Sequence, residues 1–220
     1  MHHMHSHVAT APTTTPTQGR LIRWAKSYDV MVHIATLGRS AQVRKRLANV
    51  TQVRVGDAML DVGCGTGDLA LQLAQRVGAR GSVTGIDPSP EMIARAQQKA
   101  QRRQIAVDFR QEPAEALSFP DNTFDGVVSS LVFHHLPDEL KHQAVQNIAR
   151  VLKPGGRLTI IDFMNTAGQM GGHGGVAAGA PTFMYLLQQM GFVDATSGSV
   201  KFRALHMPPI GFVAARLPNA

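Results

Sequence analysis

The chain has 220 residues, of which 44% are hydrophobic, so it is long enough for one domain with a sizeable core. The single cysteine excludes an internal disulfide framework, and no apolar run is long enough to cross a membrane. The net charge of +7 is uneven: residues 1–60 carry eight Lys/Arg and two Asp/Glu (+6), whereas residues 61–220 carry fourteen and thirteen (+1).

Residues 1–18 are rich in His, Thr and Pro and show no periodicity, which predicts a disordered tail outside the fold. Its histidines, at positions 2, 3, 5 and 7, are either metal ligands or the remnant of a purification tag. No metal site is predicted elsewhere. The tail has no apolar segment typical of a signal peptide, so a cytoplasmic location is expected.

Residues 19–50 have the apolar spacing of helices, interrupted near Gly38. Ser40 is predicted to cap the second helix, in which Val43 and Leu47 face away from a basic stretch. That stretch, Arg39–Arg46, favours either peripheral contact with an anionic membrane or a solvated helix face. The solvated face is the simpler interpretation.

From residue 58 onward, short apolar strands alternate with helical patterns. Ser89 and Pro90 are a helix start, and Pro137 opens another helix that residues 153–156 end. The predicted strands are Ala58–Val62, Ser82–Ile86, Ala106–Arg110, Gly126–Ser130 and Arg157–Phe163.

Residues 164–180 contain six glycines and are predicted to form a flexible loop. Residues 181–220 follow as a closing helix, Thr182–Met190, and a strand hairpin. The whole pattern predicts an α/β fold with a doubly wound, mainly parallel, seven-stranded Rossmann-like sheet. We expect one domain over residues 19–220, with residues 19–50 as an N-terminal helical lid and residues 58–163 as a cofactor-binding core.

The loop after the first strand contains glycines at every second position, Gly63, Gly65 and Gly67, and the acidic Asp61 precedes them. A dinucleotide fold uses a different glycine spacing, and a phosphate loop needs a Lys-Ser or Lys-Thr pair after its glycines. A carboxylate at this place repels a pyrophosphate and suits a ligand that presents an ammonium group.

This loop resembles the glycine motif of the class I S-adenosylmethionine-dependent methyltransferases. The resemblance implies that Asp61, Gly63, Gly65 and Gly67 hold the amino-acid end of S-adenosylmethionine, whose product is S-adenosylhomocysteine. Cys64 lies within the motif and is interpreted as a small packed residue of the binding site rather than a nucleophile.

Asp87 ends the second strand, 20 residues after Gly67, and an acidic residue here can accept hydrogen bonds from ribose hydroxyls. Pro88 and Met92 follow it at the start of the next helix and are assigned to the same site.

Residues 111–125 resemble the family segment that binds adenine, but the family's Asp falls on Pro113. Glu112 either replaces that Asp or points to solvent, and Ala114 keeps its backbone N–H for the ring. After the fourth strand, Ser129 and Leu131 are expected near the methionine part of the cofactor.

His134 and His135 are the candidate catalytic bases, because a neutral imidazole accepts a proton near neutral pH. The alternative is that one of them caps a helix or packs on the sheet.

The segment Trp24–Asp29 narrows the resemblance to the methyltransferase type 11 group, and in particular to the ubiquinone/menaquinone-biosynthesis C-methyltransferases and bacterial phospholipid N-methyltransferases. In these relatives the N-terminal helix folds over the cofactor, so Tyr28 is assigned to the cofactor site. The relatives with quinone substrates carry a longer insertion where this chain has its glycine-rich loop.

The predicted function is methyl transfer to an N, O or C nucleophile of a small-molecule or lipid-like acceptor. The alternatives are a membrane-surface phospholipid headgroup N-methyltransferase and a non-catalytic cofactor-binding protein. A nucleic-acid substrate is ranked low, because the Asn-Pro-Pro-Tyr and Asp-Pro-Pro-Tyr motifs of amino-methylating enzymes are missing. Neither the acceptor nor the oligomeric state follows from the sequence.

Overall fold

The computed structural model describes residues 24–163, 179–201 and 208–219. Seven strands form one sheet in the order β3-β2-β1-β4-β5-β7-β6, and the first five run parallel while β7 is antiparallel to both its neighbours. This confirms the predicted fold class. The strands are β1 Ala58–Val62, β2 Ser82–Asp87, β3 Asp108–Gln111, β4 Phe124–Ser130, β5 Leu152–Phe163, β6 Val193–Ser199 and β7 Ile210–Arg216.

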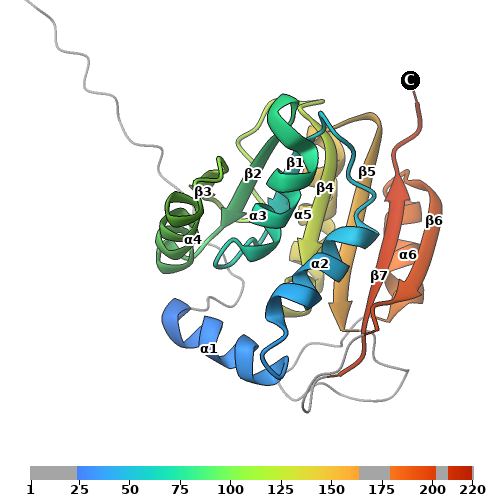
Figure 1. The fold of residues 1–220 in the computed structure, drawn as a ribbon. Coiled ribbons are helices and arrows are strands. Elements are labelled where there is room, and N and C mark those ends of the chain that lie inside the picture. Colours follow the sequence, from blue (N-terminus) through green and yellow to red (C-terminus); the bar gives the residue numbers. More distant parts are fainter. Residues whose placement is uncertain (1–23, 164–178, 202–207, 220) are drawn as a thin grey trace, which may run out of the picture.

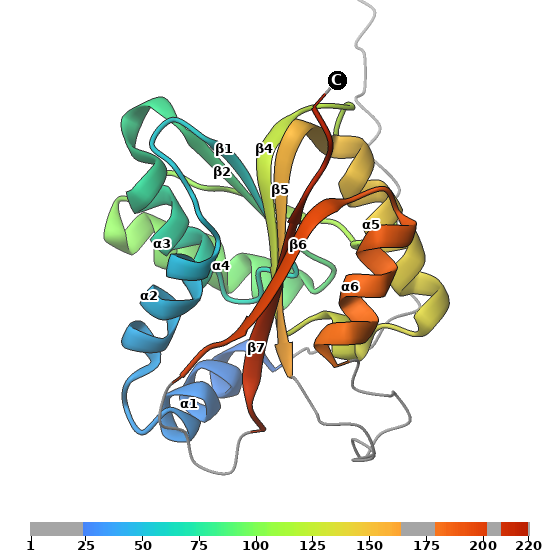
Figure 2. The ribbon, with the colours of Figure 1, turned by 90° about the vertical axis from the view of Figure 1, so that its right-hand side faces the viewer.

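Helices cover both faces of the sheet (Figure 2). One core cluster packs α2, α3 and α4 against one face, and the other packs α5 and α6 against the opposite face. The helices are α1 Ala25–Ala35, α2 Ser40–Val50, α3 Asp68–Val77, α4 Pro90–Arg103, α5 Asp138–Val151 and α6 Ala180–Gln189. No helix in these described residues is long and apolar enough to span a membrane.

The start of α4 confirms one local prediction, and the start of α2 contradicts another. The Ser89 hydroxyl accepts a hydrogen bond from the Met92 backbone N–H at 3.2 Å, and Pro90 is the first helical residue. Ser40, in contrast, is already inside α2, and Arg39 precedes the helix without a side-chain cap. The Ser40 cap was therefore wrong.

The boundary between α5 and β5 also differs from prediction. The helix ends at Val151, and β5 begins at Leu152 rather than at Arg157. Leu152 pairs with Phe124 of β4, and the Gly155 backbone N–H donates to the Pro218 carbonyl oxygen at 3.0 Å. These long-range backbone bonds extend the strand through residues 153–156, which local turn chemistry had marked as a loop.

The carboxyl ends of the parallel strands meet at one edge of the sheet, and α1 lies beside that edge (Figure 1). Ligands of doubly wound sheets bind outside these strand ends. The predicted tail, residues 1–18, and residues 164–178 of the predicted loop lie outside the described residues.

Candidate functional site

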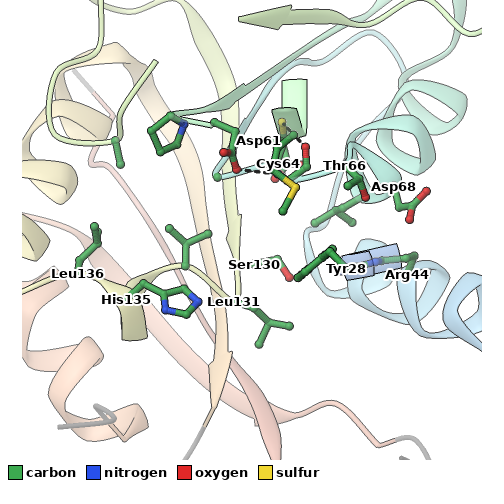
Figure 3. Close-up of a pocket in the computed structure, with 18 of the residues that line it drawn as sticks. Tyr28, Arg44, Asp61, Cys64, Thr66, Asp68, Ser130, Leu131, His135 and Leu136 are labelled. Carbon is green, nitrogen blue, oxygen red and sulfur yellow. Dashed lines mark hydrogen bonds between the residues drawn. The ribbon is translucent and has the colours of Figure 1, made fainter. Parts of the chain in front are cut away.

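A cavity opens at the carboxyl edge of the sheet, between the strand-end loops and the N-terminal helices (Figure 3). Most of the predicted site residues line it. They are Tyr28, Asp61, Gly63, Cys64, Gly65, Asp87, Pro88, Met92, Ala114, Leu131 and His135. The predicted residues outside the lining are Gly67, Glu112, Pro113, Ser129 and His134.

The three glycines of the loop have positive φ angles, but they meet different surroundings. A Cβ on Gly63 would lie 2.3 Å from a Val132 methyl carbon, and one on Gly67 would lie 2.7 Å from the Phe109 ring. A Cβ on Gly65 meets nothing within 4 Å. Gly67 therefore serves helix–sheet packing rather than the cavity, whereas Gly65 leaves its backbone open to a ligand.

Asp61 is the most unusual group in the cavity. Its carboxyl is buried at the end of β1, and within the described part of the chain neither oxygen makes a hydrogen bond of ordinary distance and angle. Burial raises its pKa to about 7, and the charge of Asp87 acts in the same direction. The charge of Arg44 and, less strongly, the Ala70 backbone N–H of α3 oppose this rise. Buried polar groups are nearly always paired, so this carboxyl marks the place of a missing partner.

Asp87 differs from Asp61 because both its oxygens are occupied. One accepts from the Gly65 backbone N–H at 3.0 Å and the other from the Ser89 N–H at 2.9 Å. Burial raises its pKa to about 6 despite these two bonds. Asp87 thus joins the glycine loop to the start of α4, and each carboxylate oxygen keeps a further lone pair for a hydroxyl donor.

Cys64 lies in the same loop, and its thiol is buried. Burial raises the pKa of the thiol well above its usual value, and the nearby carboxylates Asp61 and Asp87 raise it further. A thiol that stays protonated is a poor nucleophile, in agreement with its interpretation as a packed residue.

The N-terminal helices contribute two side chains to the cavity, Tyr28 from α1 and Arg44 from α2, which lie next to each other in Figure 3. The sequence assigned Arg44 to a solvated or membrane-facing basic stretch, and this was wrong. The Arg44 Nε is buried without a hydrogen-bond partner in the described chain. Arg44 and the buried Asp61 line the same cavity, and the charge of Arg44 acts on Asp61, so the cavity contains groups of opposite charge.

The position of α1 depends on a cluster of charges around Asp29, next to Tyr28. The Asp29 carboxylate accepts from Lys99 Nζ at 2.8 Å, from the Thr66 hydroxyl at 2.7 Å and from Arg95 Nε at 3.0 Å. Lys99 also pairs with Asp68 at 3.0 Å. Burial alone raises the pKa of Asp29, but these hydrogen bonds, from Lys99 first, hold it below its usual value.

At the predicted adenine end, Glu112 neither lines the cavity nor points to solvent. Its side chain is buried, and it accepts a hydrogen bond from the Ser118 backbone N–H. Glu112 thus closes its own loop, which contradicts the alternative in which it points to solvent, and its role at the adenine ring stays a prediction. Ala114 and Glu115 line the cavity here instead, whereas Pro113 is not part of the lining.

After β4, the cavity side belongs to Ser130 rather than Ser129. The Ser129 hydroxyl donates to the Val62 carbonyl oxygen at 3.0 Å, across the sheet. Successive strand residues point to opposite faces, so a shift of one residue exchanges their roles. Leu131 follows with φ 60°, a strained conformation for leucine that turns the chain into the cavity.

The two histidines lie in one turn but in different surroundings. His134 Nδ1 lies 2.6 Å from Asp162 Oδ1, and its backbone N–H donates to Asp162 Oδ2 at 3.1 Å. His135 lines the cavity, and its ring centroid lies 3.9 Å from that of His134. Asp162 is buried at the end of β5, where it fixes the His134 ring.

Sequence reasoning missed Asp162 and several lining residues. A polar residue at the carboxyl end of an otherwise apolar strand was a usable signal for Asp162. The lining residues that carried no distinct signal are Arg44, Thr66, Asp68, Leu69, Glu115, Ser130, Val132 and Leu136. Among the residues that the structure describes, no three His, Cys, Asp or Glu side chains form a group that could hold a metal ion.

Residues 59–156 match the family model described as a methyltransferase domain. The demethylmenaquinone methyltransferase of Desulfitobacterium hafniense is 38% identical over 63% of this chain and 54% of its own length. The ubiquinone/menaquinone biosynthesis C-methyltransferase of Francisella philomiragia is 36% identical over 63% of this chain and 56% of its own length. The chain thus spans little more than half the length of these curated relatives.

Solved structures share the fold. The [4+2]-cyclase SpnF matches with a TM-score of 0.70 and 24% identity over 82% of each chain. Magnesium protoporphyrin IX methyltransferase from Synechocystis PCC 6803, with bound S-adenosylhomocysteine, matches with a TM-score of 0.66 and 20% identity over 87% of this chain and 94% of its own. Residues 59–156 thus match a methyltransferase domain, and the strand order and the glycine loop agree with the class I, S-adenosylmethionine-dependent kind.

Proposed function

We propose that the chain transfers a methyl group from S-adenosylmethionine to an N, O or C nucleophile of a small-molecule or lipid-like acceptor. The observation that carries this proposal is the buried, unpartnered carboxyl of Asp61 in a cavity that begins at the glycine loop. An ammonium group is the partner that such a carboxylate lacks.

The cavity residues fit the cofactor part by part. Asp61 and Arg44 line the same cavity, the charge of Arg44 acts on Asp61, and the two would hold the ammonium and carboxylate of its amino-acid end. Asp87 would accept from the ribose hydroxyls, and Gly65 allows close backbone approach. When bound, the cofactor supplies a sulfonium methyl that is already electrophilic. The protein therefore has to align the acceptor and exclude water.

The proton of the acceptor would go to a histidine. Asp162 accepts a hydrogen bond from His134 Nδ1, so the proton-accepting site of a neutral His134 ring is Nε2. His134 and Asp162 come from the carboxyl ends of β4 and β5, beside the cavity-lining His135. We propose that the two adjacent histidines act together as the general base: His135 faces the acceptor in the cavity, and Asp162 positions the His134 ring, whose centroid lies 3.9 Å from that of His135.

The acceptor is proposed only by class. The relatives named for quinone biosynthesis favour a carbon atom of a quinone-like acceptor. SpnF, by contrast, has this fold and is named as a cyclase, so the fold alone does not specify transfer. A cytoplasmic location with peripheral contact to an anionic membrane belongs to the same proposal.

Isothermal titration of the full chain with S-adenosylmethionine tests the binding step, and turnover of methyl-labelled cofactor with quinol-type acceptors tests the transfer. We expect binding at one site and label transfer that Asp61→Asn abolishes. A folded sample that binds no cofactor would overturn the proposal. Binding without label transfer to any component of a metabolite extract would favour the non-catalytic alternative.

The role of His134 needs a separate experiment. We expect His134→Asn to lower kcat by roughly 10²- to 10⁴-fold and to leave cofactor affinity unchanged. Asp162→Asn should lower kcat less and shift its pH profile, because the tautomer of His134 changes. His142→Asn is the matched control, since His142 is exposed on α5. An unchanged kcat in His134→Asn would refute the base.

A further inference from the structure

Helix α1 and the residues next to it expose an unusual amount of apolar surface. Large apolar side chains that are at least 46% exposed follow one another along it, and we call them the α1 apolar face. They are Trp24 (48%), Val30 (59%), Met31 (46%), Ile34 (61%) and Leu37 (52%). In the part of the chain that the structure describes, the other exposed large apolar residues are Val55, Tyr185 and Val193, which lie in three separate places.

The exposure follows from how α1 is held. At about 100° per residue, Val30, Met31 and Ile34 fall on one side of the helix, and Asp29 falls on another. Asp29 is fixed to the protein body by Lys99, Arg95 and Thr66. The helix is thus attached through a charged residue, and its apolar side chains are turned outward. A contiguous apolar patch of this kind marks an interaction surface.

The charge of the neighbouring residues indicates which kind of partner binds the α1 apolar face. Residues 24–50 contain five Lys/Arg and one Asp, a net charge of +4. Arg44 points into the cavity and Arg46 donates to the Lys201 carbonyl oxygen, but Arg39 and Lys45 remain exposed. A second copy of this chain, paired symmetrically, would bring two such basic segments together. An anionic lipid surface complements both the apolar side chains and the cations.

We propose that the α1 apolar face docks on anionic lipid bilayers and lies in the headgroup region. Helix α1 lies beside the carboxyl edge of the sheet in both ribbon views (Figures 1 and 2). Tyr28, from the same helix, lines the cavity. Docking therefore places the cavity next to the bilayer, where a lipid-like acceptor resides. This inference rests on the peripheral membrane contact proposed above, but vesicle binding does not depend on methyl transfer, so the two can fail separately.

Trp24 is the only tryptophan of the chain and belongs to the α1 apolar face, so its fluorescence reports on docking. The full chain is mixed with vesicles of phosphatidylcholine alone or with phosphatidylglycerol added. We expect flotation with the anionic vesicles, a blue shift of Trp24 emission and quenching by brominated acyl chains. Emission that no vesicle changes would overturn the proposal.

Two variants separate the contributions. The double variant Val30→Ser/Ile34→Ser should float at least about tenfold less, because it removes the outermost apolar side chains. Val55→Ser is the matched control, since Val55 is 66% exposed but lies before β1. Circular dichroism verifies that both variants fold.

Three outcomes decide between occupants. Loss of flotation in the double variant but not in Val55→Ser supports docking through α1. Equal flotation of the double variant and the parent chain would overturn it. A concentration-dependent dimer that the double variant loses, without vesicle binding, would assign the face to a second copy and also overturn the proposal.

Discussion

Asp61 and Asp29 lie at the same edge of the sheet, but their surroundings are opposite. Asp29 has three hydrogen-bond donors around it, and its pKa is lowered. Asp61 makes no hydrogen bond of ordinary geometry in the described chain, the Ala70 backbone N–H offsets its burial only in part, and its pKa is raised to about 7. A satisfied carboxylate stabilises the fold, whereas an unsatisfied buried one destabilises it until a ligand supplies the partner. The difference separates the attachment of α1 from the binding site.

The largest effect is expected for Asp61→Asn. The variant should bind S-adenosylhomocysteine roughly a hundredfold less tightly, because removing one member of a buried ion pair costs about 3 kcal/mol or more. The unfolding free energy of the ligand-free variant at pH 8 should equal or exceed that of the parent, since a buried unpaired charge is gone. Calorimetric titration and urea unfolding measure the two quantities. Unchanged affinity would contradict the assignment of Asp61.

The raised pKa of Asp61 gives the second prediction, for the ligand-free protein. Between about pH 4 and pH 7 the folded state binds more protons than the unfolded state, in which Asp has a pKa near 3.8. The unfolding free energy should therefore fall as pH rises through this range, by on the order of 4 kcal/mol from Asp61. Asp87, with a pKa of about 6, adds to the same slope.

Ligand affinity should change in the opposite direction. Below pH 7 the ammonium of the ligand must first displace the proton of Asp61, so affinity should rise with pH, by at most about tenfold per unit. Titrations in two buffers of different ionisation enthalpy would detect the released proton. Asp61→Asn should remove this dependence, and a variant that kept it would point to another group.

The sequence predicted this region well because the strand ends carry local signals. The glycine spacing, Asp61 and Asp87 sit where a strand turns into a helix, and chain-local chemistry is enough to find them. Ser129 and Gly67 lie outside the cavity lining, because the direction of the Ser129 side chain depends on strand register and the close packing of Gly67 depends on distant residues. Asp162 was missed for a similar reason: its partner, His134, is 28 residues away.

Arg44 is a second case in which the local sequence does not predict the direction of a side chain. In sequence it belongs to a run of three basic residues, and only the packing of α2 on α3 turns it inward while Lys45 stays exposed. Local patterns identified the helix but not which of its cations is buried. Within the predicted membrane-binding stretch, Arg44 therefore lines the cavity, whereas Arg39 and Lys45 are exposed at the surface.

Arg44→Gln gives the third prediction. It should weaken S-adenosylhomocysteine binding by about tenfold, as expected for losing one charged contact of about 1.5 kcal/mol. It should also raise the pKa of Asp61 further, because Arg44 opposes protonation there. The affinity–pH curve then shifts to higher pH. Lys45→Gln is the matched control on the neighbouring exposed residue, and an equal loss in both variants would indicate a general charge effect.

The smallest effect is expected for Asp29→Asn, although the chemical change is the same as in Asp61→Asn. Its partners are partly exposed, so the variant should lose about 1 kcal/mol of unfolding free energy and only a few-fold in ligand affinity. The loss should shrink in high salt, and it should disappear progressively as the pH falls from the ordinary Asp value near 3.8 through the lowered pKa of Asp29 in the folded parent. Urea unfolding with Trp24 emission as the reporter of α1 measures it. The same Asp-to-Asn change would thus lower the unfolding free energy at Asp29 but not at Asp61. Ligand affinity, in contrast, would fall more at Asp61 than at Asp29. A larger binding loss at Asp29 than at Asp61 would mean that α1, rather than the strand end, holds the ligand.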